Sequence, residues 1–169
     1  MEKYNLSDIL IIGGGGFALT LTKAAEYAIR AMRFLASHKE KKCFSIGEIA
    51  NAEDIPVQFL AKLMQKLCHA GLVKSLCGKK GGYMIAKDPS KITLKDILFA
   101  MEGPLFLNEC LAYPNICRFH PECKVHEVWK EAQEAMLGIL SKYTLADVLQ
   151  GAAQELPKKA SRKRRKASA

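Results

Sequence analysis

The sequence predicts a mainly α-helical fold with one small β-hairpin: a winged helix-turn-helix domain followed by a long dimerisation helix. Three patterns lead to this prediction. Two short helical patterns separated by a tight turn span residues 45–71, as in a helix-turn-helix. A Gly-rich hairpin pattern follows at 72–86, and a long amphipathic helical pattern occupies 125–143.

The chain is expected to divide into four parts. The first contains four consecutive glycines, Gly13 to Gly16, which belong to no regular element. We interpret it either as a flexible arm or as a stretch upstream of a true start at Leu19. The parts are an extension at 1–19, a winged DNA-binding domain at 20–87, a cysteine loop and dimerisation helix at 88–150, and a basic disordered tail at 151–169.

Helix starts are marked by residues that can cap them. Thr22 precedes the apolar repeat that continues to Ser37. Ser45 with Glu48 forms an S-x-x-E capping box, and Thr93 begins a T-x-x-D pattern that ends at Asp96. A last short helix is expected to begin at Thr144.

The second helix of the helix-turn-helix is expected to have one core face and one polar face. Pro56 suits its first turn, and Gly71 suits its end. The core face is predicted to contain Phe59, Leu60, Leu63, Met64 and Leu67, and the polar face Gln58, Lys62, Gln65 and Lys66. Gln and Lys can hydrogen-bond base edges in the major groove of DNA. The alternative is an ordinary solvated helix face.

The net charge of +9 comes mostly from the tail. Residues 158–169 include seven Lys and Arg and no acid, which leaves +2 for the rest of the chain. Any DNA-binding surface of the folded part must therefore come from local clusters, such as Lys79 and Lys80 in the Gly-rich hairpin. No run of 18 apolar residues occurs, so we expect no membrane span and a cytoplasmic protein.

Three of the six cysteines, Cys110, Cys117 and Cys123, lie within one short stretch. This spacing lacks the C-x2-C knuckles typical of zinc sites and favours an iron–sulfur cluster. Zinc and unligated thiols remain alternatives, whereas a disulfide framework does not suit a chain of this length without a secretory signal. His126 is a candidate fourth ligand, and His120 is a weaker one. No catalytic pair or nucleotide-binding motif occurs, so we do not expect an enzyme.

Several segments together resemble the Rrf2 family of transcription regulators over about residues 19–150. They are Leu21-Thr22-Lys23-Ala24-Ala25-Glu26-Tyr27-Ala28, Gly71-Leu72-Val73, Gly81-Gly82-Tyr83, the cysteine loop and Trp129. The resemblance implies a homodimer with crossed long helices that binds double-stranded DNA. The candidate DNA-binding residues are Thr22, Lys23, Gln58, Lys62, Lys79, Lys80, Gly82 and Tyr83.

The resemblance also implies a [2Fe-2S] or [4Fe-4S] cluster on the three loop cysteines, near the dimer interface. In IscR-like members a histidine just after the third cysteine completes the site, and it matches His126. In NsrR-like members an acid on the first helix of the partner does so, and it matches Glu26. The expected function is a regulator, in the main a repressor, that senses cluster status, nitric oxide or redox stress. The alternative is a cofactor-free or zinc-stabilised regulator controlled by a partner protein.

Overall fold

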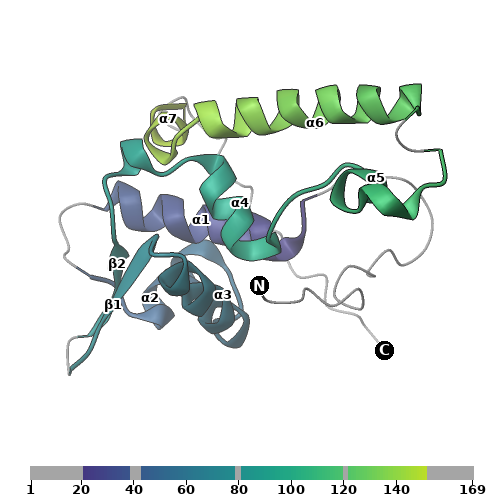
Figure 1. The fold of residues 1–169 in the computed structure, drawn as a ribbon. Helices are drawn as coiled ribbons and strands as arrows, with labels where there is room; N and C mark the ends of the chain where they lie inside the picture. The colour runs from purple at the N-terminus through teal and green to yellow at the C-terminus, as the bar shows by residue number, and fades with distance from the viewer. Residues whose placement is uncertain (1–20, 39–42, 79–80, 120–121, 152–169) are drawn as a thin grey trace, which may run out of the picture.

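The computed structural model describes residues 21–38, 43–78, 81–119 and 122–151. The expected extension, residues 152–169 of the basic tail and the Lys79–Lys80 pair therefore lie outside the described residues, as does His120, whereas Gly151 belongs to the last helix. Figure 1 shows a winged domain in the lower half of the molecule and a long helix above it. The predicted fold class is confirmed.

The winged domain consists of three helices and a hairpin in the predicted order. The elements are α1 (Lys23–Ser37), α2 (Ile46–Glu53), α3 (Val57–His69), β1 (Val73–Leu76) and β2 (Gly82–Ile85). The two strands pair antiparallel, with Val73 opposite Ile85. Both strands lie within the range predicted for the hairpin, 72–86.

A single residue before α2 extends the hairpin. Phe44 and Tyr83 form an isolated antiparallel bridge. The Phe44 main-chain N donates to the Tyr83 carbonyl at 2.9 Å, and the Tyr83 N donates to the Phe44 carbonyl at 2.7 Å. The chain between α1 and α2 is therefore attached to the wing, a contact that the sequence did not indicate.

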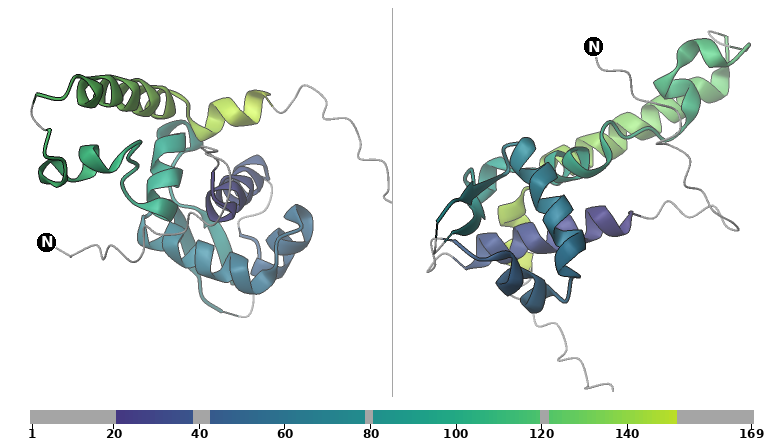
Figure 2. Two further views of the ribbon diagram at one scale, coloured as in Figure 1. Left: turned by 90° about the vertical axis from the view of Figure 1, so that its right-hand side faces the viewer. Right: turned by 90° about the horizontal axis from the view of Figure 1, so that it is seen from below.

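The second half of the chain runs over the winged domain and then away from it. Its elements are η2 (Pro89–Lys91), α4 (Leu94–Glu102), α5 (Glu109–Ala112), η3 (Pro114–Ile116), α6 (Lys124–Lys142) and α7 (Leu145–Gly151). α4 packs against α1, α3 and α6, and α7 packs against α1. α5 and the N-terminal end of α6 project together from the body of the molecule (Figures 1 and 2). The predicted cysteine loop contains two short helices, α5 and η3, which no sequence pattern indicated.

Three helices begin with the same reciprocal cap. The Ser45 hydroxyl accepts from Glu48 N, while the Glu48 carboxylate accepts from Ser45 N at 2.8 Å. Thr93 and Asp96 form the same arrangement at α4. Thr144 and Asp147 repeat it at α7, where the Thr144 N donates to the carboxylate at 2.8 Å. Each cap satisfies main-chain N–H groups that have no partner within the helix.

The hydrophobic core surrounds α1. It includes residues from every helix of the winged domain and from α4 and α7, among them Ala28, Met32, Ile49, Leu60, Met64, Leu67, Ile97 and Leu145, all fully buried. Phe59, which was predicted on the core face of α3, is 39% exposed and contacts the Tyr27 ring edge-on at 5.7 Å. It therefore lies at the margin of the core, beside Tyr27 of α1, whereas its neighbour Leu60 is fully buried.

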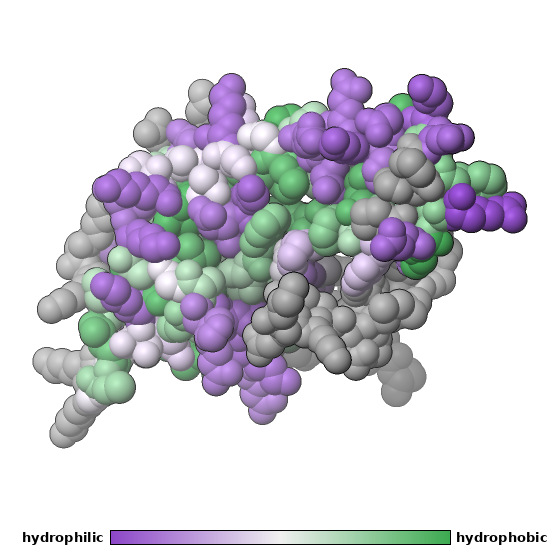
Figure 3. Space-filling view, in the orientation of Figure 1, coloured by the Kyte–Doolittle hydropathy of each residue, from purple (hydrophilic) through white to green (hydrophobic). Residues whose placement is uncertain are grey.

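α6 contrasts with the winged domain because none of its residues is buried. Its apolar side chains include Val125, Val128 and Ile139, which are each about 60% exposed. Figure 3 shows hydrophobic surface exposed along the projecting part of the molecule, among hydrophilic side chains. Within the described ranges, no helix is both long enough and apolar enough to cross a membrane.

Candidate nucleic-acid interface and cysteine loop

α3 presents the predicted base-contacting side chains to solvent. It buries Leu60, Leu63, Met64 and Leu67. Gln58 and Lys62 are exposed and lie one helical turn apart, on the same face. They are therefore placed where a recognition helix needs polar side chains.

Lys66, also predicted on the polar face, is already engaged within the protein. Its ammonium donates to the main-chain carbonyl of Met101 at the end of α4, at 2.9 Å. A solvent-open cavity of about 680 Å³ lies beside this bond, between α3 and the last turn of α4. No sequence pattern indicated this contact, because the two residues are distant in the chain.

The start of α1 brings together two further candidates for DNA contact. The Thr22 hydroxyl caps α1 by accepting from Ala25 N at 3.2 Å, and it donates to the Glu102 carboxylate. The Lys23 ammonium lies 2.6 Å from the Glu26 carboxylate. The hydrogen bond and attraction from Glu26 raise the pKa of Lys23, and the same hydrogen bond lowers the pKa of Glu26.

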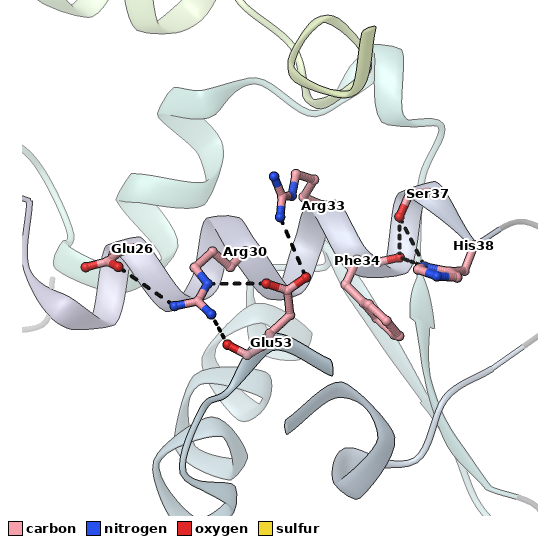
Figure 4. A network of polar contacts seen from close by, with 7 residues as sticks. All are labelled: Glu26, Arg30, Arg33, Phe34, Ser37, His38 and Glu53. Carbon is pink, nitrogen blue, oxygen red and sulfur yellow. Dashed lines mark hydrogen bonds and ion pairs between the residues drawn. The ribbon is translucent and has the colours of Figure 1, made fainter. Parts of the chain in front are cut away.

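Glu26 is the first member of a chain of ion pairs (Figure 4). Arg30 lies 3.8 Å from Glu26 and donates through Nε to the Glu53 carboxylate at 3.2 Å. A second nitrogen of the same guanidinium donates to the Glu53 main-chain carbonyl. Arg33 lies 3.8 Å from the other oxygen of Glu53. The network links α1 to the end of α2, where the turn of the helix-turn-helix begins.

The opposite end of α1 has a smaller polar cluster. The Ser37 hydroxyl donates to the Phe34 carbonyl at 3.0 Å, and Nδ1 of His38 lies 2.8 Å from the same oxygen (Figure 4). The His38 ring also stacks against Phe34, with 4.3 Å between ring centroids. These contacts close the last turn of α1.

The structure gives Gly82 and Tyr83 close internal contacts at the base of the wing. A Cβ added at Gly82 would lie 2.4 Å from the Phe44 carbonyl oxygen, so no side chain fits there. Tyr83 is half-buried and packs against the core. Both are candidate DNA-binding residues from the sequence, and both also hold the wing against the rest of the domain.

The three loop cysteines are distributed over consecutive short elements. Cys110 lies in α5, Cys117 follows η3, and Cys123 precedes α6. All three are half-buried and free of disulfides. The loop is attached to α6 because the Leu107 N donates to the Gln133 side chain at 3.0 Å.

The two candidate fourth ligands occupy different surroundings. His126 is half-buried in the first turn of α6, and its main-chain N donates to the Cys123 carbonyl at 3.1 Å. Glu26 belongs to the α1 network described above. Among the described residues, no three His, Cys, Asp or Glu side chains are grouped closely enough to hold a metal ion.

A winged helix-turn-helix with exposed Gln and Lys on its second helix defines a DNA-binding transcription regulator. Residues 21–151 match the model of the Rrf2 family, described as iron-dependent transcriptional regulators, and the chain belongs to this family. The family consists of regulators rather than enzymes.

Individual relatives agree with this assignment. The chain is 35% identical to the HTH-type transcriptional regulator NsrR of Geobacillus kaustophilus, over 78% of this chain and 90% of the relative. It is 28% identical to IscR of Photorhabdus laumondii, over 78% of this chain and 79% of the relative.

Solved structures show the same fold. CymR of B. subtilis, described as the global cysteine regulator of that organism, matches with a TM-score of 0.68 and 28% identity, over 79% of this chain and 98% of that one. IscR of T. potens matches with a TM-score of 0.64 and 29% identity, over 85% of this chain and 97% of that one.

Proposed function

We propose that this protein is a homodimeric repressor that binds double-stranded DNA and senses iron–sulfur supply, nitric oxide or redox stress through an iron–sulfur cluster on Cys110, Cys117 and Cys123. The observation that most strongly supports a cluster is the state of these three cysteines. Three half-buried thiols, none in a disulfide, follow one another on the loop between α4 and α6. The protein would act in the cytoplasm, where bacterial DNA lies.

The donor set fits such a cluster chemically. Thiolates are the usual protein ligands of iron–sulfur clusters, and partial burial of the thiols would protect a bound cluster from solvent. The cluster would supply iron whose oxidation state and ligands respond to the chemistry of the cell. The loop itself is short-helical and linked to α6 through Leu107 and Gln133, so a change in the loop would be passed to that helix.

The fourth ligand is either His126 or Glu26 of the second protomer. His126 follows Cys123 by one helical turn, which favours it on sequence proximity. Glu26 would have to exchange its contacts with Lys23 and Arg30 for a contact with iron. Coordination by Glu26 would therefore disturb the ion pairs that lead to Glu53 and the helix-turn-helix.

The dimer is supported by the composition of α6. Val125, Val128, Ile139 and Tyr143 leave about half or more of their surfaces exposed, and α6 has no buried residue. A second copy of the same helix would cover this apolar surface, whose burial is favourable by about 25 cal/mol per Å². A twofold dimer would also place two recognition helices at two DNA half-sites.

The decisive experiment is anaerobic purification of the full chain, with measurement of the absorption spectrum, iron and acid-labile sulfide. We expect brown protein with iron and sulfide in similar amounts. Cys110→Ser, Cys117→Ser and Cys123→Ser should each abolish the colour. Cys43→Ser, Cys68→Ser and Cys77→Ser are matched controls that should retain it. Stoichiometric zinc without sulfide would overturn the proposal.

A second candidate is a cofactor-free or zinc-stabilised regulator controlled by a partner protein. The structural similarity to CymR favours it. This candidate predicts that colourless protein binds its operator fully and that the loop Cys→Ser variants regulate normally.

A further inference from the structure

The last turn of α4 contacts two of the three elements that were predicted to face DNA, the recognition helix and the start of α1. Met101 accepts a hydrogen bond from Lys66 on α3. Its neighbour Glu102 accepts one from Thr22 at the start of α1. Two consecutive residues thus hold the recognition helix and the first turn of α1.

The cysteine loop begins directly after these residues. α4 ends at Gly103, which has a φ of 73° and a ψ of −158°. This conformation is almost restricted to glycine, so the direction in which the loop leaves α4 depends on Gly103. Figure 1 shows the chain passing from this point to α5, which contains Cys110.

The Lys66 bond lies beside a solvent-open groove between α3 and the end of α4. The cavity between α3 and the end of α4 is lined by Gln65 and His69 on one side and by Phe99 on the other. Met101 itself is buried, with 4% of its surface exposed. A shift of the α4 end would therefore reach α3 through the Lys66–Met101 bond as well as through the core.

We propose that the end of α4, residues Met101 to Gly103, transmits the state of the cysteine loop to the DNA-binding surface through Lys66 and Thr22. Lys66 is then a positioning residue and not a DNA contact. This inference rests on the proposed regulatory function. It adds the route by which the loop changes operator affinity, which requires an element whose position both sites influence.

The first test compares operator affinity of the full-length dimer with its cluster and after iron removal by a chelator, using fluorescence anisotropy. Lys66→Met retains the apolar stem and removes the donor, so the ratio of the two Kd values should fall to within about twofold of one. Lys66→Arg should restore the ratio. Lys95→Met is the matched control because Lys95 contacts the Phe99 ring on α4, 5.2 Å from its centroid. An equal loss of affinity in both states would make Lys66 a simple DNA contact and overturn the proposal.

The second test does not depend on the cluster. Gly103→Ala strains the junction through the backbone alone, since a Cβ there would meet no atom within 4 Å. In apo protein, the effect of Gly103→Ala on operator affinity should differ by more than about twofold between wild-type and Lys66→Met backgrounds. Equal effects would overturn the coupling even if the cluster is present. Non-additive effects in a protein that never binds iron would uphold the coupling while refuting the cluster.

Discussion

Arg30 and Glu53 join the middle of α1 to the end of α2 through two hydrogen bonds from one guanidinium. One bond reaches the carboxylate at 3.2 Å, and the other reaches the main-chain carbonyl of the same residue. Glu53 is the last residue of α2 and is only 11% exposed at its side chain. The pair therefore fixes the point at which the chain turns toward α3.

Removing this contact should destabilise the winged domain. Arg30→Met leaves the Glu53 carboxylate with only the longer 3.8 Å contact to Arg33. We expect the free energy of unfolding to fall by about 1.5–3 kcal/mol, as for other hydrogen bonds to charged groups. Urea unfolding followed by circular dichroism measures it. Arg33→Met is the control and should lower the free energy of unfolding by less. An equal decrease would mean that the two hydrogen bonds of Arg30 stabilise the domain no more than the longer Arg33 contact does.

The cap of α7 predicts a pH dependence. Hydrogen bonds from the Thr144 hydroxyl and main chain hold the pKa of Asp147 below its ordinary value of about 3.8. As the pH falls, the unfolded chain takes up this proton before the folded one. The stabilisation is therefore complete above the ordinary pKa and is lost as the pH falls through the lower, folded value.

Asp147→Asn should remove the part of the acid-dependent loss of stability that comes from protonation of Asp147. Thermal unfolding from about pH 7 down to about pH 3 checks the effect. Asp54→Asn at the end of α2 makes the same charge change and serves as the control. Parallel pH profiles for the wild-type chain and the Asp147→Asn variant would contradict the interpretation.

The recognition helix and the wing should differ in their effects on DNA binding. Gln58→Ala and Lys62→Ala should reduce the preference for the operator over random DNA by about 1–3 kcal/mol per base contact. Lys79→Ala and Lys80→Ala should weaken binding to operator and to random DNA alike, and should reduce the salt dependence of the affinity. Anisotropy titrations at several salt concentrations separate the two patterns. If Gln58→Ala weakened binding to operator and to random DNA equally, the prediction that Gln58 contacts a base would be wrong.

The apolar surface of α6 should be required for dimer formation. Ile139→Glu places a charge on a side chain that is 59% exposed in the single chain, and burial of an unpaired charge in an interface is costly. We expect monomers by light scattering and weaker operator binding. Lys130→Glu, an exposed position on the same helix, is the control. A wild-type chain that is monomeric at micromolar concentration would refute the dimer.

The fourth ligand can be assigned by comparing His126→Ala with Glu26→Ala. The variant that makes the brown colour labile in air, measured as the decay of absorbance, identifies the ligand. Glu26→Gln is a second useful variant, because it preserves the shape of the side chain while removing its charge. If neither position matters, the loop holds the cluster with three cysteines and one open iron position.

Local signals predicted the helices of this protein well. Ser45 with Glu48 and Thr93 with Asp96 mark helix starts because their hydrogen bonds span only three residues. Gly71 has a φ of 67° just after α3, as expected of a residue that ends a helix. The helices α5 and η3 were missed because elements of three or four residues are too short to produce a hydrophobic period.

Contacts between distant residues could not be predicted in this way. Lys66 and Met101, and Phe44 and Tyr83, are brought together only by the packing of whole elements. The candidate ligands in the cysteine loop were identified from residue type and spacing, whereas their relative positions depend on the path of a loop with few regular hydrogen bonds. The exposure of Phe59 likewise depends on how α3 packs against α1, where the ring meets Tyr27.

The contact of Gly82 with Phe44 restricts how the DNA preference of this protein could be redesigned. A side chain at position 82 would collide with the main chain that leads into α2, and would push the hairpin away from the helix that precedes the recognition helix. Libraries that vary the wing should therefore randomise residues 77–80, which follow β1 in the sequence, and leave Gly82 unchanged. New operator preferences obtained in this way would come from the varied side chains, while the contact between β2 and Phe44 keeps the two strands in place on the domain.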